Sequence, residues 1–145
     1  MMRRENLPPV TIAAGDYERL TGIVTVGAND PRNRPAAAML AGELMRATVV
    51  TDRAVPRTVA TMHSRVEFRD DVTLDVCCAT LVYPGEADDK PDRISVLSPI
   101  GAALIGLREG QSIAWRTPKG WRSLTLLQVF YQPYGQFVEP WRERS

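Results

Sequence analysis

The chain has 145 residues, of which 44% are hydrophobic and 24% are charged, the usual balance of a globular protein with one hydrophobic core. No apolar run approaches the roughly 20 residues of a membrane-spanning helix, and no apolar stretch follows the N-terminal arginines, so we expect a cytoplasmic protein with neither a membrane anchor nor a secretory signal. The net charge is +1, but residues 66–92 carry two basic and eight acidic side chains, which argues against a general nucleic-acid-binding protein.

The first third of the chain predicts two short helices. The first is expected to begin at Tyr17, with Asp16 as its N-cap residue, because a side-chain oxygen there can accept a free backbone N–H. Turn-forming residues fill 28–35, and Pro35 suits the first position of the second helix. Apolar residues recur at helical spacing: Tyr17, Leu20, Ile23 or Val24 and Gly27 in the first helix, and Ala37, Leu40, Ala41, Leu44 and Ala47 or Thr48 in the second. With about three turns each, they predict an antiparallel helical hairpin within residues 1–48.

After Ala47 the chain becomes rich in alternating apolar and polar residues, which is typical of β-strands. The predicted strands are Val59–Phe68, Thr73–Tyr83, Arg93–Leu97, Ser112–Arg116 and Arg122–Tyr131. Residues 117–120 predict a hairpin turn between the last two strands, with Trp115 and Trp121 placed to stack across it. Residues 84–91 predict an exposed loop, and the acidic stretch over residues 66–92 as a whole is either a solvated rim or a protein-docking surface.

Residues 93–111 predict a strand, a short helix and a turn in unbroken order. Ser98 offers a hydroxyl at the N-cap position, and Pro99 occupies the first helical position, where a missing N–H costs nothing. Gly106 suits the left-handed conformation that ends a short helix. The chain as a whole predicts an α+β architecture: a helical hairpin over residues 1–48, an antiparallel sheet crossed by one short helix over 49–134, and a polar tail over 135–145.

The sequence offers little of the chemistry that enzymes need. His63 is the single histidine, and its predicted place on a strand puts Ser64 on the opposite face, so the two cannot pair as base and nucleophile. The sequence contains no phosphate-binding loop, nucleophile elbow or dinucleotide fingerprint. Cys77 and Cys78 are adjacent, so a disulfide between them is not expected, and a metal site there would need further soft ligands. We therefore expect no catalytic residue, no metal and no cofactor.

Several motifs carry a resemblance to a known family. Residues 95–106, SVLSPIGAALIG, resemble the signature of the C-terminal domain of the bacterial Gre transcript-cleavage factors. A wider set of segments is similar to the Rnk family, regulators of nucleoside diphosphate kinase and shorter relatives of the Gre factors: Thr61–Phe68, Thr80–Pro84, Pro99–Arg108 and Tyr131–Pro133. These segments cover most of residues 47–133 in order, so the chain resembles a Rnk-type member of the GreA/GreB transcription elongation factor family.

This resemblance implies a fold, a partner and a contact site. Gre C-terminal domains have an FKBP-like fold, a curved antiparallel sheet wrapped on one helix, which here would be residues 99–106. Gre factors bind bacterial RNA polymerase near its secondary channel through the β′ subunit, and the corner at Leu97, Ser98 and Pro99 would lie in that contact. Arg122, on a different predicted strand, is expected to matter little for it.

The resemblance also exposes a difference in activity. Gre factors insert a long coiled coil whose two acidic tip residues help to hold a catalytic magnesium ion. The hairpin predicted here is short, and its loop carries one acid, Asp30, beside Arg32 and Arg34. We therefore expect a regulator that binds the polymerase without stimulating transcript cleavage. The two arginines either keep the loop soluble or contact an acidic channel wall or a phosphate.

Two other functions remain open from the sequence. The FKBP-like fold suggests a peptidyl-prolyl isomerase with an aromatic-lined pocket, to which Trp115, Trp121 and Trp141 could contribute. The Rnk name suggests an interaction module whose target is a kinase or another metabolic enzyme. We expect no direct sequence-specific contact with nucleic acid and no membrane partner.

Overall fold

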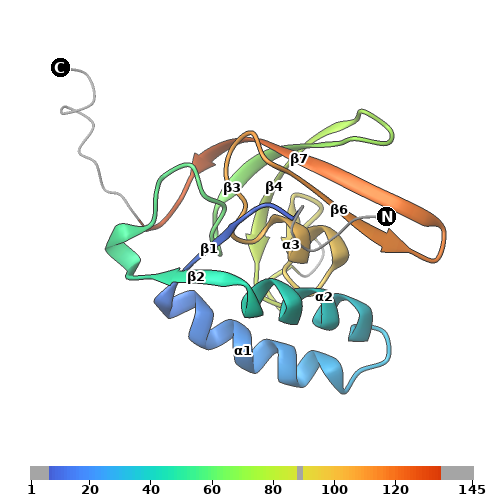
Figure 1. Ribbon diagram of the computed structural model, residues 1–145, viewed down its shortest axis with the longest axis horizontal. Coiled ribbons are helices and arrows are strands. Elements are labelled where there is room, and N and C mark those ends of the chain that lie inside the picture. Colours follow the sequence, from blue (N-terminus) through green and yellow to red (C-terminus); the bar gives the residue numbers. More distant parts are fainter. Residues whose placement is uncertain (1–6, 88–89, 135–145) are drawn as a thin grey trace.

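The computed structural model of the chain describes residues 7–87 and 90–134, so the predicted tail over 135–145 and Trp141 lie outside the described residues. Its elements are β1 (Val10–Ala13), α1 (Ala14–Ala28), α2 (Arg34–Met45), β2 (Ala47–Val50), a short 3-10 helix (Asp52–Ala54), β3 (Arg65–Asp70), β4 (Val76–Val82), β5 (Arg93–Ser95), α3 (Pro99–Leu104), β6 (Ser112–Thr117) and β7 (Gly120–Tyr131). Figure 1 shows α1 and α2 lying together on one side of the molecule, with β1 and β2 beside them and the larger sheet beyond. The predicted α+β class is confirmed.

Helix α1 begins earlier than predicted and without the predicted cap. It starts at Ala14, and the residue at its N-cap position, Ala13, makes no side-chain capping hydrogen bond. Asp16 lies in the first turn and is only 4% exposed, so the prediction that it caps the helix was wrong. Its carboxylate instead accepts a hydrogen bond from the N–H of Met62, 3.2 Å away, and so ties the helix to a segment far along the chain.

The apolar stripes predicted for the two helices are confirmed, except that α2 ends at Met45 and the predicted last positions, Ala47 or Thr48, belong to β2. Leu20 and Gly27 are buried on α1, and Ala37, Leu40 and Leu44 are buried on α2. The two helices contact each other and are joined by residues 29–33. Within the described residues, neither they nor α3 has the length and apolar character that crossing a membrane requires.

A small parallel sheet lies beside the helices. β1 and β2 pair in parallel, from Val10 opposite Ala47 to Ala13 opposite Val50. Parallel neighbours need a crossover connection, and here α1 and α2 together supply it. Each strand has four residues, which is too short for an alternating pattern to predict their pairing from sequence.

The larger sheet has the strand order β5-β4-β3-β7-β6. Its neighbours are antiparallel except for β4 and β5, which pair in parallel. The prediction of a purely antiparallel sheet was therefore wrong, because β5 runs in the same direction as β4. β4 and β5 are also shorter than the predicted strands Thr73–Tyr83 and Arg93–Leu97. The FKBP-like description stays a prediction.

A turn replaces the first part of the predicted strand Val59–Phe68. His63 has a φ of 65°, which a regular strand does not accommodate. The N–H of Ser64 donates to the carbonyl oxygen of Thr61 at 3.1 Å, and the N–H of Thr61 donates to Oγ of Ser64 at 2.8 Å. The strand β3 therefore starts only at Arg65, and the predicted place of His63 on a strand was wrong.

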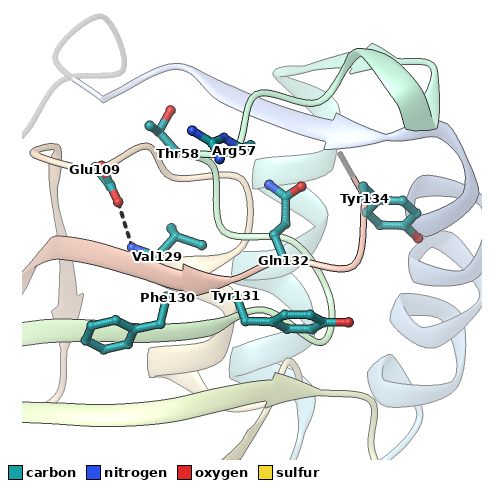
Figure 2. Close-up of a pocket in the computed structure, with 8 residues that line it drawn as sticks. All are labelled: Arg57, Thr58, Glu109, Val129, Phe130, Tyr131, Gln132 and Tyr134. Carbon is teal, nitrogen blue, oxygen red and sulfur yellow. Dashed lines mark hydrogen bonds between the residues drawn. The ribbon is translucent and has the colours of Figure 1, made fainter. Parts of the chain in front are cut away.

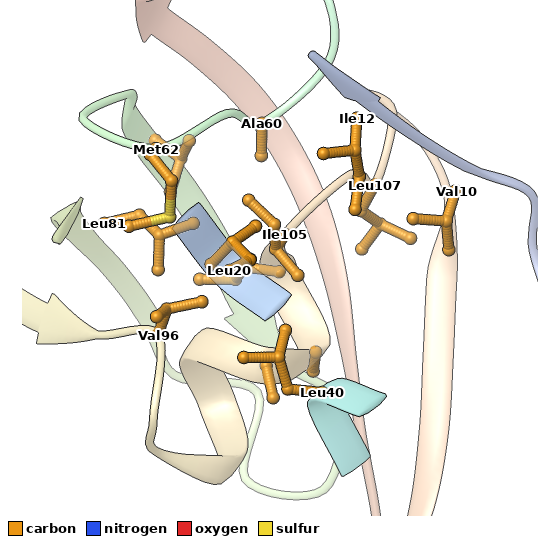
Figure 3. Close-up of a cluster of buried hydrophobic side chains, with 14 of the residues drawn as sticks. Val10, Ile12, Leu20, Leu40, Ala60, Met62, Leu81, Val96, Ile105 and Leu107 are labelled. Atoms are coloured by element: carbon orange, nitrogen blue, oxygen red, sulfur yellow. The ribbon is translucent and has the colours of Figure 1, made fainter. Parts of the chain in front are cut away.

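One cluster of buried apolar side chains joins the helices to the larger sheet and to α3 (Figure 3). Leu20 of α1 and Leu40 of α2 belong to it, together with Leu104 of α3. Helix α3 lies so close to the end of β5 that a β-carbon at Gly101 would sit 2.0 Å from the carbonyl oxygen of Ser95. Only glycine fits there, and this close approach sets the position of α3.

Gly106 adopts the predicted left-handed conformation but two residues beyond the helix. α3 ends at Leu104, and Gly106 has a φ of 80°. The N–H of Gly106 donates to the carbonyl oxygen of Ala60 at 2.8 Å, and its own carbonyl oxygen accepts from the N–H of Thr11 at 3.1 Å. The glycine thus connects the end of α3 to β1 and to the turn before β3.

Candidate docking groove

Ser98 fixes the start of α3 as the sequence predicts. Its Oγ accepts from the N–H of Gly101 at 3.1 Å and donates to the carbonyl oxygen of Ser95 at 2.6 Å. Pro99 opens the helix, and Oγ of Ser95 accepts from the N–H of Leu97 at 3.0 Å. The predicted N-cap is confirmed, and local hydrogen bonds hold the whole corner.

The residues of the predicted contact corner lie in three different environments. Leu97 is 9% exposed, and its two δ-carbons lie 3.0 Å from where a β-carbon of Gly27 would be, so its side chain packs against α1. Ser98 is half-buried and Pro99 is exposed. In this arrangement Pro99 and the edge of Ser98 face outward, whereas Leu97 supports the corner from inside.

A groove opens beside this corner, with a volume of about 440 Å³. Its lining residues come from β5, the start of α3 and the β6–β7 hairpin: Arg93, Ile94, Ser95, Ser98, Pro99, Ile100, Trp115, Thr117 and Arg122. We call it the docking groove. Arg122, which was expected to matter little for the contact, therefore shares a surface with Ser98 and Pro99.

The register of the β6–β7 hairpin explains why Trp115 and Arg122 meet in the docking groove. Thr117 pairs with Gly120 across the predicted turn, so Trp115 pairs with Arg122 and Arg116 pairs with Trp121. Because side chains alternate along a strand, Trp115 and Trp121 point to opposite faces. The predicted stacking of the two tryptophans was wrong, and the guanidinium of Arg116 instead lies 5.7 Å from the ring centre of Trp121.

An ion pair holds Arg122 in the docking groove. Its Nη2 lies 2.5 Å from Oδ2 of Asp70, and Oδ1 of Asp70 accepts from the N–H groups of Val72 and Thr73 at 2.8 and 3.2 Å. These two backbone hydrogen bonds, and then the charge of Arg122, lower the pKa of Asp70. The carboxylate therefore stays charged at neutral pH and orients the guanidinium.

Two nitrogen atoms of the docking groove have no hydrogen-bond partner among the described residues. They are Nε1 of Trp115 and Nε of Arg122, and both are buried. Buried N–H groups in folded proteins are nearly always paired. Their presence side by side on a cross-strand pair marks this surface as one that lacks an acceptor.

A second pocket of about 400 Å³ lies at the other end of β7 (Figure 2). Gln132 points into it, and its Nε2 donates to the carbonyl oxygens of Pro56 and Val59, each at 2.8 Å. Glu109 accepts from the N–H of Val129 at 2.8 Å. Phe130 and Tyr131 point to the opposite side of the strand. Gln132 thus fastens the loop before β3 to the end of β7, and Glu109 fastens the segment before β6 to β7, which are structural roles.

The single histidine, His63, lies in a hydrogen-bonded group on the surface. Nε2 of His63 is 2.9 Å from Oε1 of Glu86, which also accepts from the N–H of Tyr83 at 2.9 Å. The ring of His63 meets the ring of Tyr83 edge-on at 5.6 Å. Ser64 is turned inward and bonded to Thr61, so it is no nucleophile for His63. The described residues contain no group of three His, Cys, Asp or Glu side chains that could hold a metal ion.

The single acid of the hairpin loop is engaged within the loop. Oδ1 of Asp30 accepts from the N–H of Arg32 at 3.0 Å, and Oδ2 accepts from Nδ2 of Asn33 at 3.2 Å. Nε of Arg34 donates to the carbonyl oxygen of Ala28 at 3.1 Å. The carboxylate therefore shapes the turn, and the guanidinium of Arg34 closes it.

Comparisons with known proteins agree in both halves of the chain. The family described as "Transcription elongation factor, GreA/GreB, C-term" matches residues 55–131, and that described as "Rnk N-terminus" matches residues 8–50. The "Regulator of nucleoside diphosphate kinase" of Escherichia coli is 44% identical over 100 residues, which covers 68% of this chain and 74% of that protein. GreA of Syntrophobacter fumaroxidans is 32% identical over 128 residues, covering 83% and 82% of the two chains.

A solved structure supports the same assignment. The prokaryotic transcription elongation factor GreA/GreB from Nitrosomonas europaea has a TM-score of 0.66 and 37% sequence identity, covering 86% of this chain and 99% of that one. The GreA/GreB family match over residues 55–131 includes the strands and the short helix that form the docking groove. Because the GreA/GreB match covers more than half of the sequence and the Rnk match covers the helical part before it, the chain belongs to the GreA/GreB transcription elongation factor family, as a member with a Rnk-type N-terminus.

Proposed function

We propose that the protein regulates transcription by binding bacterial RNA polymerase at the rim of its secondary channel through the docking groove. The observation that carries the proposal is the exposed Pro99 beside Ser98 at the edge of this groove, in the segment that carries the Gre signature. The Gre resemblance makes the β′ subunit the expected contact and the cytoplasm the expected location. Membership of the family favours such a regulator over the peptidyl-prolyl isomerase considered from the sequence.

The proposed regulator does not stimulate transcript cleavage. α1 has 15 residues and α2 has 12, which span about 22 and 18 Å at 1.5 Å per residue. This reach is short for a helical arm that must deliver carboxylates to a polymerase active site. A magnesium ion needs carboxylate oxygens, and the one acid of the loop, Asp30, is already bonded to Arg32 and Asn33.

Capture of polymerase from a bacterial lysate by the tagged full-length protein tests the docking proposal. Pro99→Glu should weaken capture at least about tenfold, since a carboxylate desolvated at an interface costs several kcal/mol. Pro133→Glu is the matched control, because Pro133 is exposed and does not line the docking groove. Circular dichroism of both variants should match that of the wild type. If a folded Pro99→Glu variant captured as much polymerase as the wild type, the docking groove would not be the polymerase contact.

Stalled elongation complexes test the absence of cleavage activity. Addition of the protein should leave transcript lengths unchanged, and an excess should suppress cleavage by a Gre factor that binds the same rim. Magnesium-dependent release of short 3′ fragments by the protein alone would contradict the first expectation. Undiminished Gre cleavage at a saturating excess would contradict the shared site.

A nucleoside diphosphate kinase is a second candidate partner. The observation that favours it is the name of the Escherichia coli relative, which is 44% identical over 100 residues. The same capture experiment separates the two candidates, since recovery of the kinase without polymerase subunits would favour the second. In that case Pro99→Glu should weaken capture of the kinase.

A further inference from the structure

The docking groove combines an apolar wall with positive charge. Ile94, Pro99 and Ile100 supply aliphatic surface from β5 and α3, and the ring of Trp115 lies across from them on β6. Two of the lining residues, Arg93 and Arg122, are arginines, and none of the lining residues carries a carboxylate. A partner that fills this groove therefore meets apolar contacts and cationic groups together.

The two arginines do not have the same freedom. Nη1 of Arg93 donates to the carbonyl oxygen of Glu86 at 2.8 Å, and Arg93 is an exposed residue at one edge of the groove. Nη2 of Arg122 pairs with Asp70, but 41% of the Arg122 side chain remains exposed. Asp70 therefore orients Arg122 without covering it, and the Arg122 side chain still lines the groove.

The unpaired donors point to the kind of group that the partner brings. Nε1 of Trp115 and Nε of Arg122 belong to residues that face each other across β6 and β7. Both can only donate hydrogen bonds, so what they lack is an acceptor oxygen. Both atoms are buried but belong to residues that line the docking groove, so an acceptor reaches them once groove side chains rotate, as interface side chains commonly do on binding.

We infer that the docking groove binds a protein segment in which an aliphatic side chain stands next to an aspartate or glutamate. The aliphatic side chain packs against Ile94, Pro99 and Ile100, and the carboxylate accepts from Trp115 and Arg122. This inference rests on the proposed function and names the partner chemistry at the same site. A nucleic-acid strand fits less well, because the groove wall is largely aliphatic and single-stranded nucleic acids are held on several aromatic stacking platforms, of which this groove has one.

Indole NMR of the full-length protein tests the inference directly. The protein is labelled with 15N-tryptophan, and Trp115→Phe assigns the resonance of Trp115. The probes are the acetylated and amidated peptides Asp-Leu-Glu-Leu and Asn-Leu-Gln-Leu. The acidic peptide should move the Trp115 indole signal at several-fold lower concentration than the neutral one, and salt should reduce the difference. Trp121, on the opposite face, should not move.

Equal responses of Trp115 to the two peptides would overturn the inference, and so would the absence of any response at millimolar peptide. A response of Trp121 equal to that of Trp115 would show non-specific association and would also count against it. Arg122→Gln should weaken binding of the acidic peptide to the level of the neutral one. Arg53→Gln is the matched control, because Arg53 is exposed on the 3-10 helix and does not line the docking groove.

Polymerase capture with the same variants separates this inference from the proposed function. Trp115→Phe and Arg122→Gln should each weaken capture about tenfold or more, because each removes a buried donor to a charged acceptor. If the wild type captures polymerase and both folded variants capture it equally well, the inference fails and the proposed function stands. If the wild type captures no polymerase while the acidic peptide still moves Trp115 selectively, the proposed function fails and the inference stands.

Discussion

Replacement of Asp16 probes how the helices are held against the rest of the molecule. Its carboxylate accepts hydrogen bonds from three distant groups: the N–H of Met62 at 3.2 Å, the hydroxyl of Tyr134 at 2.7 Å and the hydroxyl of Tyr83 at 3.4 Å. The donors come from the turn before β3, the end of β4 and the segment after β7. One side chain of α1 therefore connects three parts of the larger sheet.

The structure gives a magnitude for two substitutions. Asp16→Ala removes the acceptor of all three donors, and each buried donor left unpaired costs about 1–3 kcal/mol. The two hydroxyls can turn toward other acceptors, and removal of a buried charge offsets part of the loss, so we expect about 3 kcal/mol less unfolding free energy at neutral pH. Asp16→Asn keeps an acceptor oxygen for the tyrosines but not for Met62, so we expect the unfolding free energy to fall by about 1–2 kcal/mol.

The pH dependence of this loss follows from the direction of the pKa shift. Burial raises the pKa of Asp16 above its usual value of 3.8, against the opposing hydrogen bonds of Tyr134 and Met62 and the charge of His63. The folded state thus binds the proton more tightly than the unfolded state. The stabilisation that this tighter proton binding gives is fully present below pH 3.8 and is lost as the pH rises through the raised pKa of Asp16 in the folded state.

The assay is urea unfolding of the wild type and Asp16→Asn at neutral pH and near pH 4. Because the asparagine has no proton to bind, the stability advantage of the wild type should be larger in acid than at neutral pH. Contributions from the other carboxylates are common to both proteins and cancel in the difference. An advantage that stays constant across this range, or that grows toward neutral pH, would refute the reasoning.

The remaining short predictions concern α3 and α2. Ser98→Ala should lower the unfolding free energy by about 1 kcal/mol through loss of the N-cap acceptor, and an unchanged urea midpoint would count against the cap. Gly101→Ala should cost about 3 kcal/mol or more, because the new β-carbon would meet the carbonyl oxygen of Ser95 at 2.0 Å. Gly42→Ala is its matched control, since nothing lies within 4 Å of a β-carbon there, and it should stabilise α2 by about 0.5–1 kcal/mol. Similar thermal shifts for the two glycine variants would contradict the close approach.

Features decided by neighbouring residues could be predicted from the sequence. The hydroxyl of Ser98 lies three residues from the N–H that it caps, and the turn over residues 117–120 closes between adjacent strands. The apolar faces of α1 and α2 followed from helical spacing alone. Each of these rests on the geometry of one turn of chain, which the residue types specify.

Features decided by residues far apart in the sequence could not be predicted in this way. No residue near Asp16 in the sequence indicates that its carboxylate accepts hydrogen bonds from Met62 and two tyrosines. An N-cap role was therefore the simpler interpretation of this residue. The parallel β5 is set by pairing between residues that are separated in the sequence, such as Thr80 and Arg93. The docking groove is an intermediate case: the hairpin turn was predicted correctly, and counting outward from it would have paired Trp115 with Arg122 instead of Trp121.

The buried cluster makes the helical part a structural component of the sheet domain, and this gives a last prediction. Leu20 and Leu40 pack in one cluster with Leu104, and the N–H of Thr11 donates to the carbonyl oxygen of Gly106. A fragment of residues 49–145 loses these contacts and exposes Leu97. Since a fully buried leucine contributes about 1.5–3 kcal/mol, the fragment should unfold at lower urea concentration than the full chain.

The fragment should also bind the dye ANS, which reports exposed apolar surface. The Rnk match ends at residue 50 and the GreA/GreB match begins at residue 55, so the division predicted between residues 48 and 49 falls within the first match, and the sheet should depend on both sides of it. Equal urea midpoints for the fragment and the full chain, without dye binding, would contradict this dependence. In that case the helical pair would be an appended arm, and the connection through Asp16 would serve to orient it rather than to stabilise the sheet.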